Sequence, residues 1–196
     1  MPLLRARFGT RRVAAGAIRI ESDRPRAGEI VQTSRFLRVD LAADDPAAAA
    51  RLPALAALLE RAGVPARIER SEAQALWSKL VRLNALALTT SASGQTIGAI
   101  RSDPDWRARL VACVREAVAV GRTEGADLQA AFTIAELDDA HASLGSSMQR
   151  DLAAGRRTEL DAIAGAVLRA ARRHGLPCPT IAELARRVAA LDSGGR

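Results

Sequence analysis

The stretch SEAQALWSKLVRLNALALTTSASG, residues 71–94, decides the fold class of this 196-residue chain. Leucines recur along it every three or four residues, at Leu76, Leu80, Leu83 and Leu86. This spacing puts them on one face of an α-helix. A serine and an acid open the segment, and a run of small polar residues that ends at Gly94 closes it. We therefore predict a long helix from Ser71 that separates two parts of different character.

After this helix the pattern stays helical. Asp103-Pro104 is expected to start a second long helix that runs to about residue 123, and a regular helix is expected over residues 158–174, ended by Gly175. Two further helices are expected to open at capping boxes, Thr133-Ile134-Ala135-Glu136 and Thr180-Ile181-Ala182-Glu183. The sequence thus predicts an all-helical domain over residues 71–192, followed by a disordered tail at residues 193–196.

Before residue 70, strand-like and helical stretches alternate. Short strands are expected at residues 12–20, 29–33, 36–41 and 64–69, with a turn-forming stretch at 23–28 and a helix at 46–61. No glycine-rich phosphate loop of either common type occurs in the chain. We therefore predict a mostly α protein in which residues 1–70 form an incomplete α/β segment, the tail end of a larger sheet.

The charge balance is basic, with 29 Lys and Arg against 22 Asp and Glu, for a net charge of +7. Of these 29 basic residues, 28 are arginine and one, Lys79, is lysine. Preference for arginine, many alanines and only 3% aromatic residues are the usual product of a GC-rich genome. The arginines are scattered among acids and lack aromatic partners for stacking bases, so no nucleic-acid partner is expected.

Several other classes are excluded by composition. The two cysteines, Cys113 and Cys178, cannot form a disulfide framework and are not spaced as metal ligands. We interpret them as small buried hydrophobic residues of a cytoplasmic protein. The first residues lack the apolar core of a signal peptide, and no apolar run is long enough to cross a membrane. Neither His141 nor His174 has neighbours that indicate a metal site.

Three short motifs carry the functional prediction. They are Leu76-Trp77-Ser78-Lys79-Leu80, then residues 146–151 (SSMQRD), then residues 155–165 (GRRTELDAIAG) followed by 170–179 (AARRHGLPCP). In this order and spacing the chain resembles the C-terminal helical domain of the ketopantoate reductase (2-dehydropantoate 2-reductase) family. The resemblance covers residues 70–192 and extends weakly back to Arg11. It implies an all-helical domain like the C-terminal domain of 6-phosphogluconate dehydrogenase, preceded by a Rossmann-type remnant.

The resemblance implies an NADP-dependent oxidoreductase of pantothenate biosynthesis that reduces a 2-keto acid to a 2-hydroxy acid, with a homodimer as a candidate assembly. Lys79 matches the catalytic lysine of the family, which also contacts substrate. An ammonium can protonate the developing alkoxide, whereas arginine is a poor proton donor. The alternative is a surface lysine that packs its stem against apolar neighbours. A lone lysine in an apolar helix of an arginine-rich chain favours the catalytic role.

Two more residues match functional positions of the family. Glu159 matches a glutamate that lies near the lysine and the cofactor, where a carboxylate can orient the ammonium. The alternative for Glu159 is an acid at a helix N-terminus. Ser147 matches a serine that hydrogen-bonds the substrate, and the alternative is a helix N-cap with Asp151, a structural acid, in the first turn.

The chain departs from the family pattern at three substrate-contacting positions. The family has asparagines four and eight residues after the lysine, where this chain has Leu83 and Ala87. Asn84 is turned about 100° from the first of these positions on a helix. A further family asparagine is replaced by Ile97. We therefore predict a keto acid, or another carbonyl compound, with a more apolar tail than ketopantoate.

The cofactor-binding fingerprint of the family lies upstream of the region that aligns here. NADP is therefore implied by the family, but we expect this chain alone to bind NADPH poorly. One interpretation is a fragment or a mis-started product of a full reductase, which the retention of Lys79, Ser147 and Glu159 favours. The other is a non-catalytic helical dimerisation remnant of the family.

Overall fold

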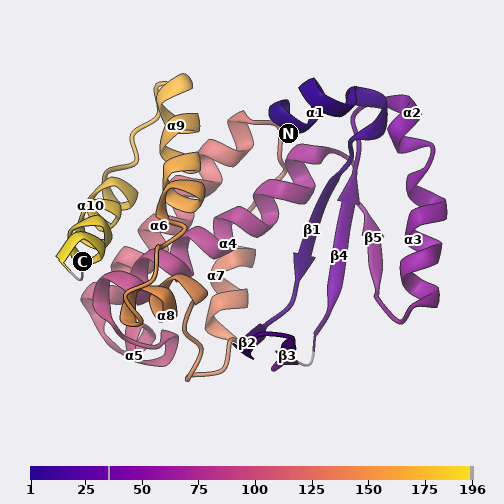
Figure 1. Ribbon diagram of the computed structural model, residues 1–196. Coiled ribbons are helices and arrows are strands. Elements are labelled where there is room, and N and C mark those ends of the chain that lie inside the picture. The colour runs from indigo at the N-terminus through magenta and orange to yellow at the C-terminus, as the bar shows by residue number, and fades with distance from the viewer. Residues whose placement is uncertain (35, 195–196) are drawn as a thin grey trace. The chain divides into compact units, whose positions relative to one another are not determined.

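The computed structural model describes residues 1–34 and 36–194 (Figure 1). The chain forms two compact units, Met1–Lys79 and Leu80–Arg196, here called the N-terminal and C-terminal units. Their boundary falls inside α4 (Glu72–Ser93), the long helix predicted from the leucine spacing. The prediction of a mostly α protein with a small sheet is confirmed. Each unit is described separately below.

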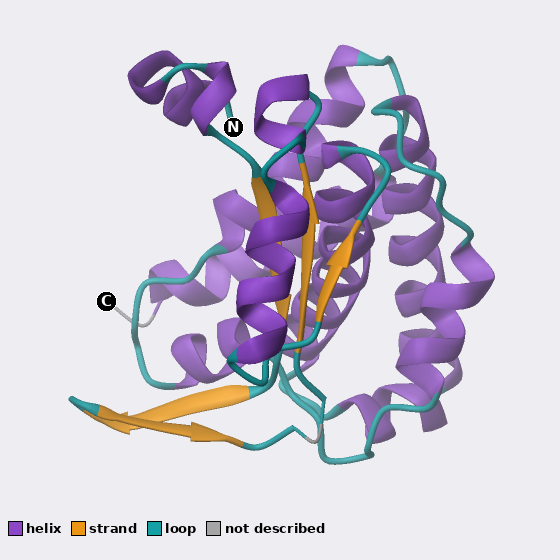
Figure 2. Cartoon of the chain, turned by 90° about the vertical axis from the view of Figure 1, so that its right-hand side faces the viewer, coloured by secondary structure: helices purple, strands orange, loops and turns teal. Residues whose placement is uncertain are grey.

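Short helices and five strands form among the described residues of the N-terminal unit. In chain order the elements before α4 are α1 (Pro2–Phe8), the 3-10 helix η1 (Thr10–Arg12), β1 (Ala15–Arg19), β2 (Ser22–Arg26), β3 (Glu29–Gln32), β4 (Arg38–Ala42), α2 (Pro46–Ala49), α3 (Leu52–Arg61) and β5 (Ala66–Ile68). Among the described residues, β4 is the middle strand of a three-stranded sheet, antiparallel to β1 and parallel to β5. Strands β2 and β3 form a separate hairpin, which Figure 2 shows as its own pair of arrows.

The start of α4 is fixed by two side chains that flank the α3–β5 segment in the sequence, Asp44 before it and Ser71 after it. Ser71 Oγ accepts a hydrogen bond from Gln74 N at 3.0 Å, as an N-cap residue does. Asp44, which follows β4, accepts from Glu72 N at 3.0 Å, and the Glu72 carboxylate accepts from Asp44 N at 3.1 Å. This reciprocal pair satisfies an N–H of the first turn and ties the helix to the end of the central strand.

Two expectations for this unit need correction. The turn-forming stretch expected at 23–28 contains the observed turn but is too long, because β2 extends to Arg26 and the turn is confined to residues 27–28, where Gly28 has a φ of 82°. The helix expected over 46–61 is interrupted after Ala49 and restarts at Leu52. Pro53 explains the interruption, since its ring would clash with the carbonyl group four residues earlier. Helix α1 was not anticipated.

Every secondary-structure element among the described residues of the C-terminal unit is a helix or a helical turn. After the second part of α4 it contains α5 (Ile97–Ser102), α6 (Pro104–Thr123), α7 (Ala130–Asp138), α8 (Ser147–Ala153), the π-helical turn η2 (Asp161–Gly165), α9 (Ala166–Arg173) and α10 (Pro179–Gly194). Helix α6 lies at its centre and contacts α5, α7, α9 and α10. The buried residues of α6 are Leu110, Cys113, Val114, Ala117, Val118, Val120 and Gly121. Helix α5 was not anticipated, whereas α8 is the helix that the N-cap alternative for Ser147 implied, and it starts one residue earlier than that alternative requires.

The capping boxes predicted at Thr133 and Thr180 are wrong, although the two helices that they were expected to open are present as α7 and α10. Helix α7 begins at Ala130, so Thr133 is a buried residue of the helix interior. Helix α10 begins at Pro179, and the N–H groups of Thr180 and Ile181 donate to the two carboxylate oxygens of Glu116, each at 2.9 Å. A carboxylate from α6 therefore caps α10 from a distant part of the sequence.

The helix expected over 158–174 is also not regular, because residues 161–165 form a π-turn before α9. It ends as expected at Gly175, with a φ of 64°. Helix α10 includes Ser193 and Gly194, the first half of the expected disordered tail, and residues 195–196 lie outside the described residues. None of the helices in the described part of the chain is long and apolar enough to span a membrane.

Candidate active site

Lys79 is the last residue of the N-terminal unit, which includes the first eight residues of α4 (72–79). Its side chain is half-buried. The residue before it, Ser78, carries a hydroxyl group that accepts a hydrogen bond from Arg19 Nη2 at 2.9 Å. The lone lysine of the chain is therefore next in sequence to a point where β1 is bonded to α4.

A buried carboxylate organises the charges on this part of the sheet. Asp40 of β4 is 0% exposed, and its Oδ2 atom accepts from Arg19 Nε at 2.7 Å. Arg38 donates to both oxygens of Asp40, from Nε at 2.7 Å and from Nη2 at 3.2 Å. Burial alone would raise the pKa of Asp40, but the hydrogen bonds and charges of Arg38 and Arg19 lower it below the usual value. Asp40 is therefore held as a carboxylate between two guanidinium groups.

Beyond Lys79, the positions four and eight residues further along α4 are apolar. Leu83 and Ala87 follow at four-residue steps, half-buried and fully buried respectively. Asn84 is 0% exposed, and neither its Oδ1 nor its Nδ2 atom has a hydrogen-bond partner among the described residues. The one asparagine of this helix is thus enclosed in the interior.

Ser147 is the exposed first residue of α8. The N-cap is its neighbour Ser146, which is 4% exposed and accepts from Gln149 N at 3.0 Å. The structural role considered for Ser147 therefore belongs to Ser146. Asp151 does not lie in the first turn of α8 either, and its carboxylate instead accepts from Arg156 Nε at 2.8 Å.

Glu159 is exposed and comes directly before the helical segment that starts at Leu160 and continues through η2 and α9. Its carbonyl oxygen accepts from Ile163 N at 3.0 Å. The carboxylate is therefore attached to the positive N-terminal end of a helix, where a negative charge is favoured.

The predicted site residues divide between the two units. Ser147 and Glu159 lie in the C-terminal unit, at the starts of two successive helical segments, whereas Lys79 lies in the N-terminal unit. Sequence reasoning missed the residues that organise the surroundings of Lys79 and Ser147, namely Arg19, Asp40, Ser78 and Ser146. Only the polar residues within the apolar alternation of residues 36–41 hinted at Asp40.

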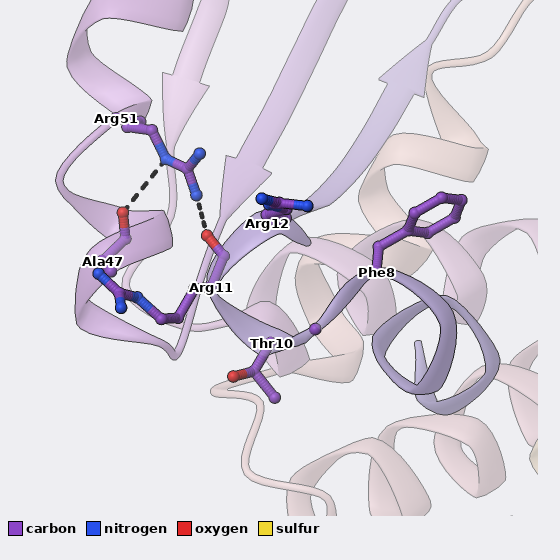
Figure 3. A pocket seen from close by; sticks show the side chains of 7 residues that line it. Phe8, Thr10, Arg11, Arg12, Ala47 and Arg51 are labelled. Carbon is purple, nitrogen blue, oxygen red and sulfur yellow. Dashed lines mark hydrogen bonds between the residues drawn. The ribbon is translucent and has the colours of Figure 1, made fainter.

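A pocket of about 700 Å³ lies elsewhere in the N-terminal unit (Figure 3). It is lined by Phe8, Gly9, Thr10, Arg11, Arg12, Ala47 and Arg51. Arg51 is committed to the backbone, since it donates to the carbonyl oxygens of Ala47 and Arg11 and so ties η1 to the end of α2. None of the predicted site residues lines this pocket.

The two cysteines are buried structural residues, as their number and spacing in the sequence suggested. Both are buried, and burial raises the pKa of Cys178 to about 11 and that of Cys113 further. Neither thiol is therefore ionised near neutral pH. Within residues 1–34 and 36–194, no group of three or more His, Cys, Asp or Glu side chains is placed to hold a metal ion.

Comparison with known proteins agrees with the motifs. Residues 73–192 match the family model described as ketopantoate reductase PanE/ApbA C terminal. The 2-dehydropantoate 2-reductase of Halobacterium salinarum is 30% identical over 138 residues, which cover 69% of this chain and 46% of the relative. This chain spans about half the length of the curated relatives that it matches.

Solved structures agree with the fold. A 2-dehydropantoate 2-reductase from Geobacter metallireducens is similar with a TM-score of 0.89 and 25% identity, over 96% of this chain and 64% of that one. A D-mandelate dehydrogenase, solved with NADH and anilino(oxo)acetate, has a TM-score of 0.90 at 18% identity, over 99% and 64% of the two chains. The second likeness concerns the fold alone.

Proposed function

The chain belongs to the ketopantoate reductase family through its C-terminal domain, and on that premise we propose that it serves the NADPH-dependent reduction of a 2-keto acid to a 2-hydroxy acid. One observation carries the proposal. The single lysine among 29 basic residues falls within the segment that matches the family model, on the helix that begins that segment. Ser147 and Glu159 fall within the same segment.

Lys79 is the proposed proton donor. Reduction of a keto group places negative charge on its oxygen, and an ammonium group next to that oxygen stabilises the charge and then transfers a proton. A guanidinium could supply the charge but not the proton near neutral pH. The half-buried position of Lys79 leaves part of its side chain accessible to a substrate.

Ser147 and Glu159 are proposed to bind and orient. The Ser147 hydroxyl is exposed, and because Ser146 performs the capping, a substrate oxygen can compete for it without cost to the helix. The exposed Glu159 carboxylate would orient the lysine ammonium and contact the cofactor, as the family motif implies.

The hydride would come from the nicotinamide of NADPH, the cofactor that the family resemblance implies. The residues at the β4–α2 connection do not fit a dinucleotide pyrophosphate. This connection contains no glycine, and the carboxylate of Asp45 already accepts from Ala47 N and Ala48 N at the start of α2. A phosphate group at this position would meet the negative charge of Asp45, whereas dinucleotide-binding folds present free backbone N–H groups to the pyrophosphate there. We therefore assign to this chain the handling of the substrate and its proton.

The apolar residues of α4 support a substrate with an apolar tail. Half-buried Leu83 stands one helical turn after Lys79, so a ligand beside the lysine would meet methyl groups there instead of an amide, whereas Ala87 one turn further is fully buried. A hydrogen-bonding site discriminates strongly against a ligand without the matching group, whereas an apolar surface does not reward a hydroxyl. We propose a 2-keto acid with an alkyl or aryl tail.

An assay of NADPH oxidation tests the proposed function. Two proteins are compared: the chain by itself, and the chain fused in frame to the half of the Halobacterium salinarum reductase that it does not match, here called the joined protein. Each is given ketopantoate and 2-keto acids that carry alkyl or phenyl tails. We expect turnover by the joined protein, with a higher kcat/KM for the apolar acids. Faster reduction of ketopantoate than of the apolar acids would refute the substrate proposal, and no turnover with any acid would refute the enzymatic one.

A second candidate is a non-catalytic dimerisation module of the same family. One observation favours an assembly: Phe132 of α7 is 67% exposed, and aromatic residues are common anchors at interfaces. Light scattering of the purified chain would measure its mass, with Phe132→Ser as the variant. A dimer that becomes a monomer in this variant supports the assembly, and a monomeric parent chain removes it.

A further inference from the structure

Four side chains of the N-terminal unit form one connected group, here called the Arg19 cluster: Arg19 of β1, Arg38 and Asp40 of β4, and Ser78 of α4. Arg19 is its central member, because its Nε atom donates to Asp40 and its Nη2 atom donates to Ser78. Arg19 and Asp40 are enclosed, with side-chain exposure of 17% and 0%, whereas Arg38 at the margin of the group is 40% exposed.

The strand register makes the cluster unusual. Arg19 and Arg38 are directly opposed in the antiparallel β1–β4 pair, and like charges in that position repel. Asp40 lies two residues from Arg38 and therefore on the same face of the sheet. Its carboxylate accepts from both guanidinium groups, which offsets the repulsion.

A packing role alone does not account for this arrangement. Enclosed charges are costly, and an apolar trio would hold two strands and a helix together at least as well. What the charges add is direction: the bond from Arg19 Nε to the Asp40 carboxylate orients the guanidinium, and Nη2 of the same group donates to Ser78 Oγ at 2.9 Å. The bond fixes the helix at the residue before Lys79.

We propose that Arg19 is a positioning residue for Lys79, acting through Ser78 to fix the turn of α4 that presents the ammonium group. Asp40 and Arg38 hold Arg19 in place for this purpose. The functional meaning rests on the proposed role of Lys79 as proton donor, whereas the coupling of Arg19 to Lys79 can be measured without it.

The composition supplies the measurement. Because the chain has one lysine, isotope-labelled lysine gives one backbone amide signal and one set of side-chain signals in an NMR spectrum, all from Lys79. Ser78→Ala removes the acceptor for Arg19, and Ser78→Thr retains a hydroxyl group. Arg26→Leu is the matched control, since it removes an arginine whose ion pair with Glu29 lies on the exposed hairpin.

We expect Ser78→Ala to shift the Lys79 side-chain signals and to lower their order parameters, with both restored in Ser78→Thr and unchanged in Arg26→Leu. Arg19→Gln, which keeps one donor, should give a smaller change of the same kind. In the joined protein, Ser78→Ala should lower kcat about tenfold with little change in KM, since a misplaced proton donor costs rate more than binding.

The outcomes separate the two proposals. Unchanged Lys79 signals in folded Ser78→Ala and Arg19→Gln overturn the positioning role, whatever the turnover. Altered signals that Ser78→Thr does not restore overturn it as well, because the hydroxyl group would then not be the link. Altered and restored signals together with turnover that survives Lys79→Ala would leave the coupling in place and refute the proton-donor role instead.

Discussion

Ser146 Oγ lies 2.8 Å from Thr90 Oγ1, and both residues are buried, so the start of α8 is hydrogen-bonded to α4 within the C-terminal unit. The same Ser146 Oγ accepts from Gln149 N as the N-cap of α8. One hydroxyl group therefore serves two bonds, while the adjacent Ser147 remains exposed. These neighbouring serines have separable roles.

Ser146→Ala should lower the free energy of unfolding by about 1–2 kcal/mol, because it removes an N-cap and leaves a buried hydroxyl with one partner fewer. Ser147→Ala should change it by less than about 0.5 kcal/mol, as exposed substitutions usually do. Urea unfolding checks both. In the joined protein, Ser147→Ala should raise the KM for the keto acid more than Ser146→Ala does. An unchanged KM in Ser147→Ala would count against the substrate contact.

Glu116 should matter more to α10 than the acid of the apparent capping box. Glu116→Ala removes the acceptor of two N–H groups, and we expect a loss of about 1–2 kcal/mol in thermal or urea unfolding. Glu183→Ala is the matched control, because Glu183 is exposed and its contact with Arg109 is 4.0 Å. A larger loss from the control would show that the sequence motif, not the contact from α6, stabilises the helix start.

Asp40 makes the chain sensitive to acid. Its folded-state pKa is lowered, so its contribution to stability is present above its unfolded pKa of about 3.9 and is lost as the pH falls through the folded value. Asp40→Asn should cost about 3 kcal/mol near neutral pH, where it leaves Arg19 and Arg38 without the carboxylate. The difference from the parent chain should shrink below about pH 4, measured by urea unfolding across pH. A difference that stays constant with pH would contradict the assignment.

The two thiols should be unreactive in the folded chain. Burial raises the pKa of Cys178 to about 11 and that of Cys113 further, so the thiolate is scarce near pH 8. A colorimetric disulfide reagent should label neither residue in native conditions and both after unfolding in urea. Rapid labelling of the native chain would show that one of the thiols is accessible.

Local pattern predicted the long elements and failed where a distant residue decides. The leucine spacing of residues 76–86 predicted α4 because helix periodicity is written in consecutive residues. The Thr180 motif satisfied every local condition for a capping box, yet Glu116, sixty-four residues earlier, supplies the acceptor. Pro53 was readable as a helix breaker, and the interruption after Ala49 could have been predicted from it.

The candidate site followed the same division. Lys79, Ser147 and Glu159 were predicted as site residues from short motifs, because type and spacing along the chain are properties that a sequence displays directly. The Arg19 cluster could not be identified, since it depends on β1–β4 register and on which face of α4 meets the sheet. Alternation over residues 36–41 predicted a strand, but a buried Asp40 bonded to two arginines is a property of strand pairing.

The proton-donor role of Lys79 is tested most directly by a comparison of Lys79→Arg with Lys79→Ala in the joined protein, with Arg26→Leu as the control for loss of a distant cation. If Lys79 donates the proton, Lys79→Arg keeps the charge but not the donor, so kcat should fall about a hundredfold or more in both variants while Arg26→Leu stays at the parent rate. Circular dichroism should show the same helix content in all four proteins. Turnover in Lys79→Arg near the parent rate would contradict the claim, because charge alone would then suffice.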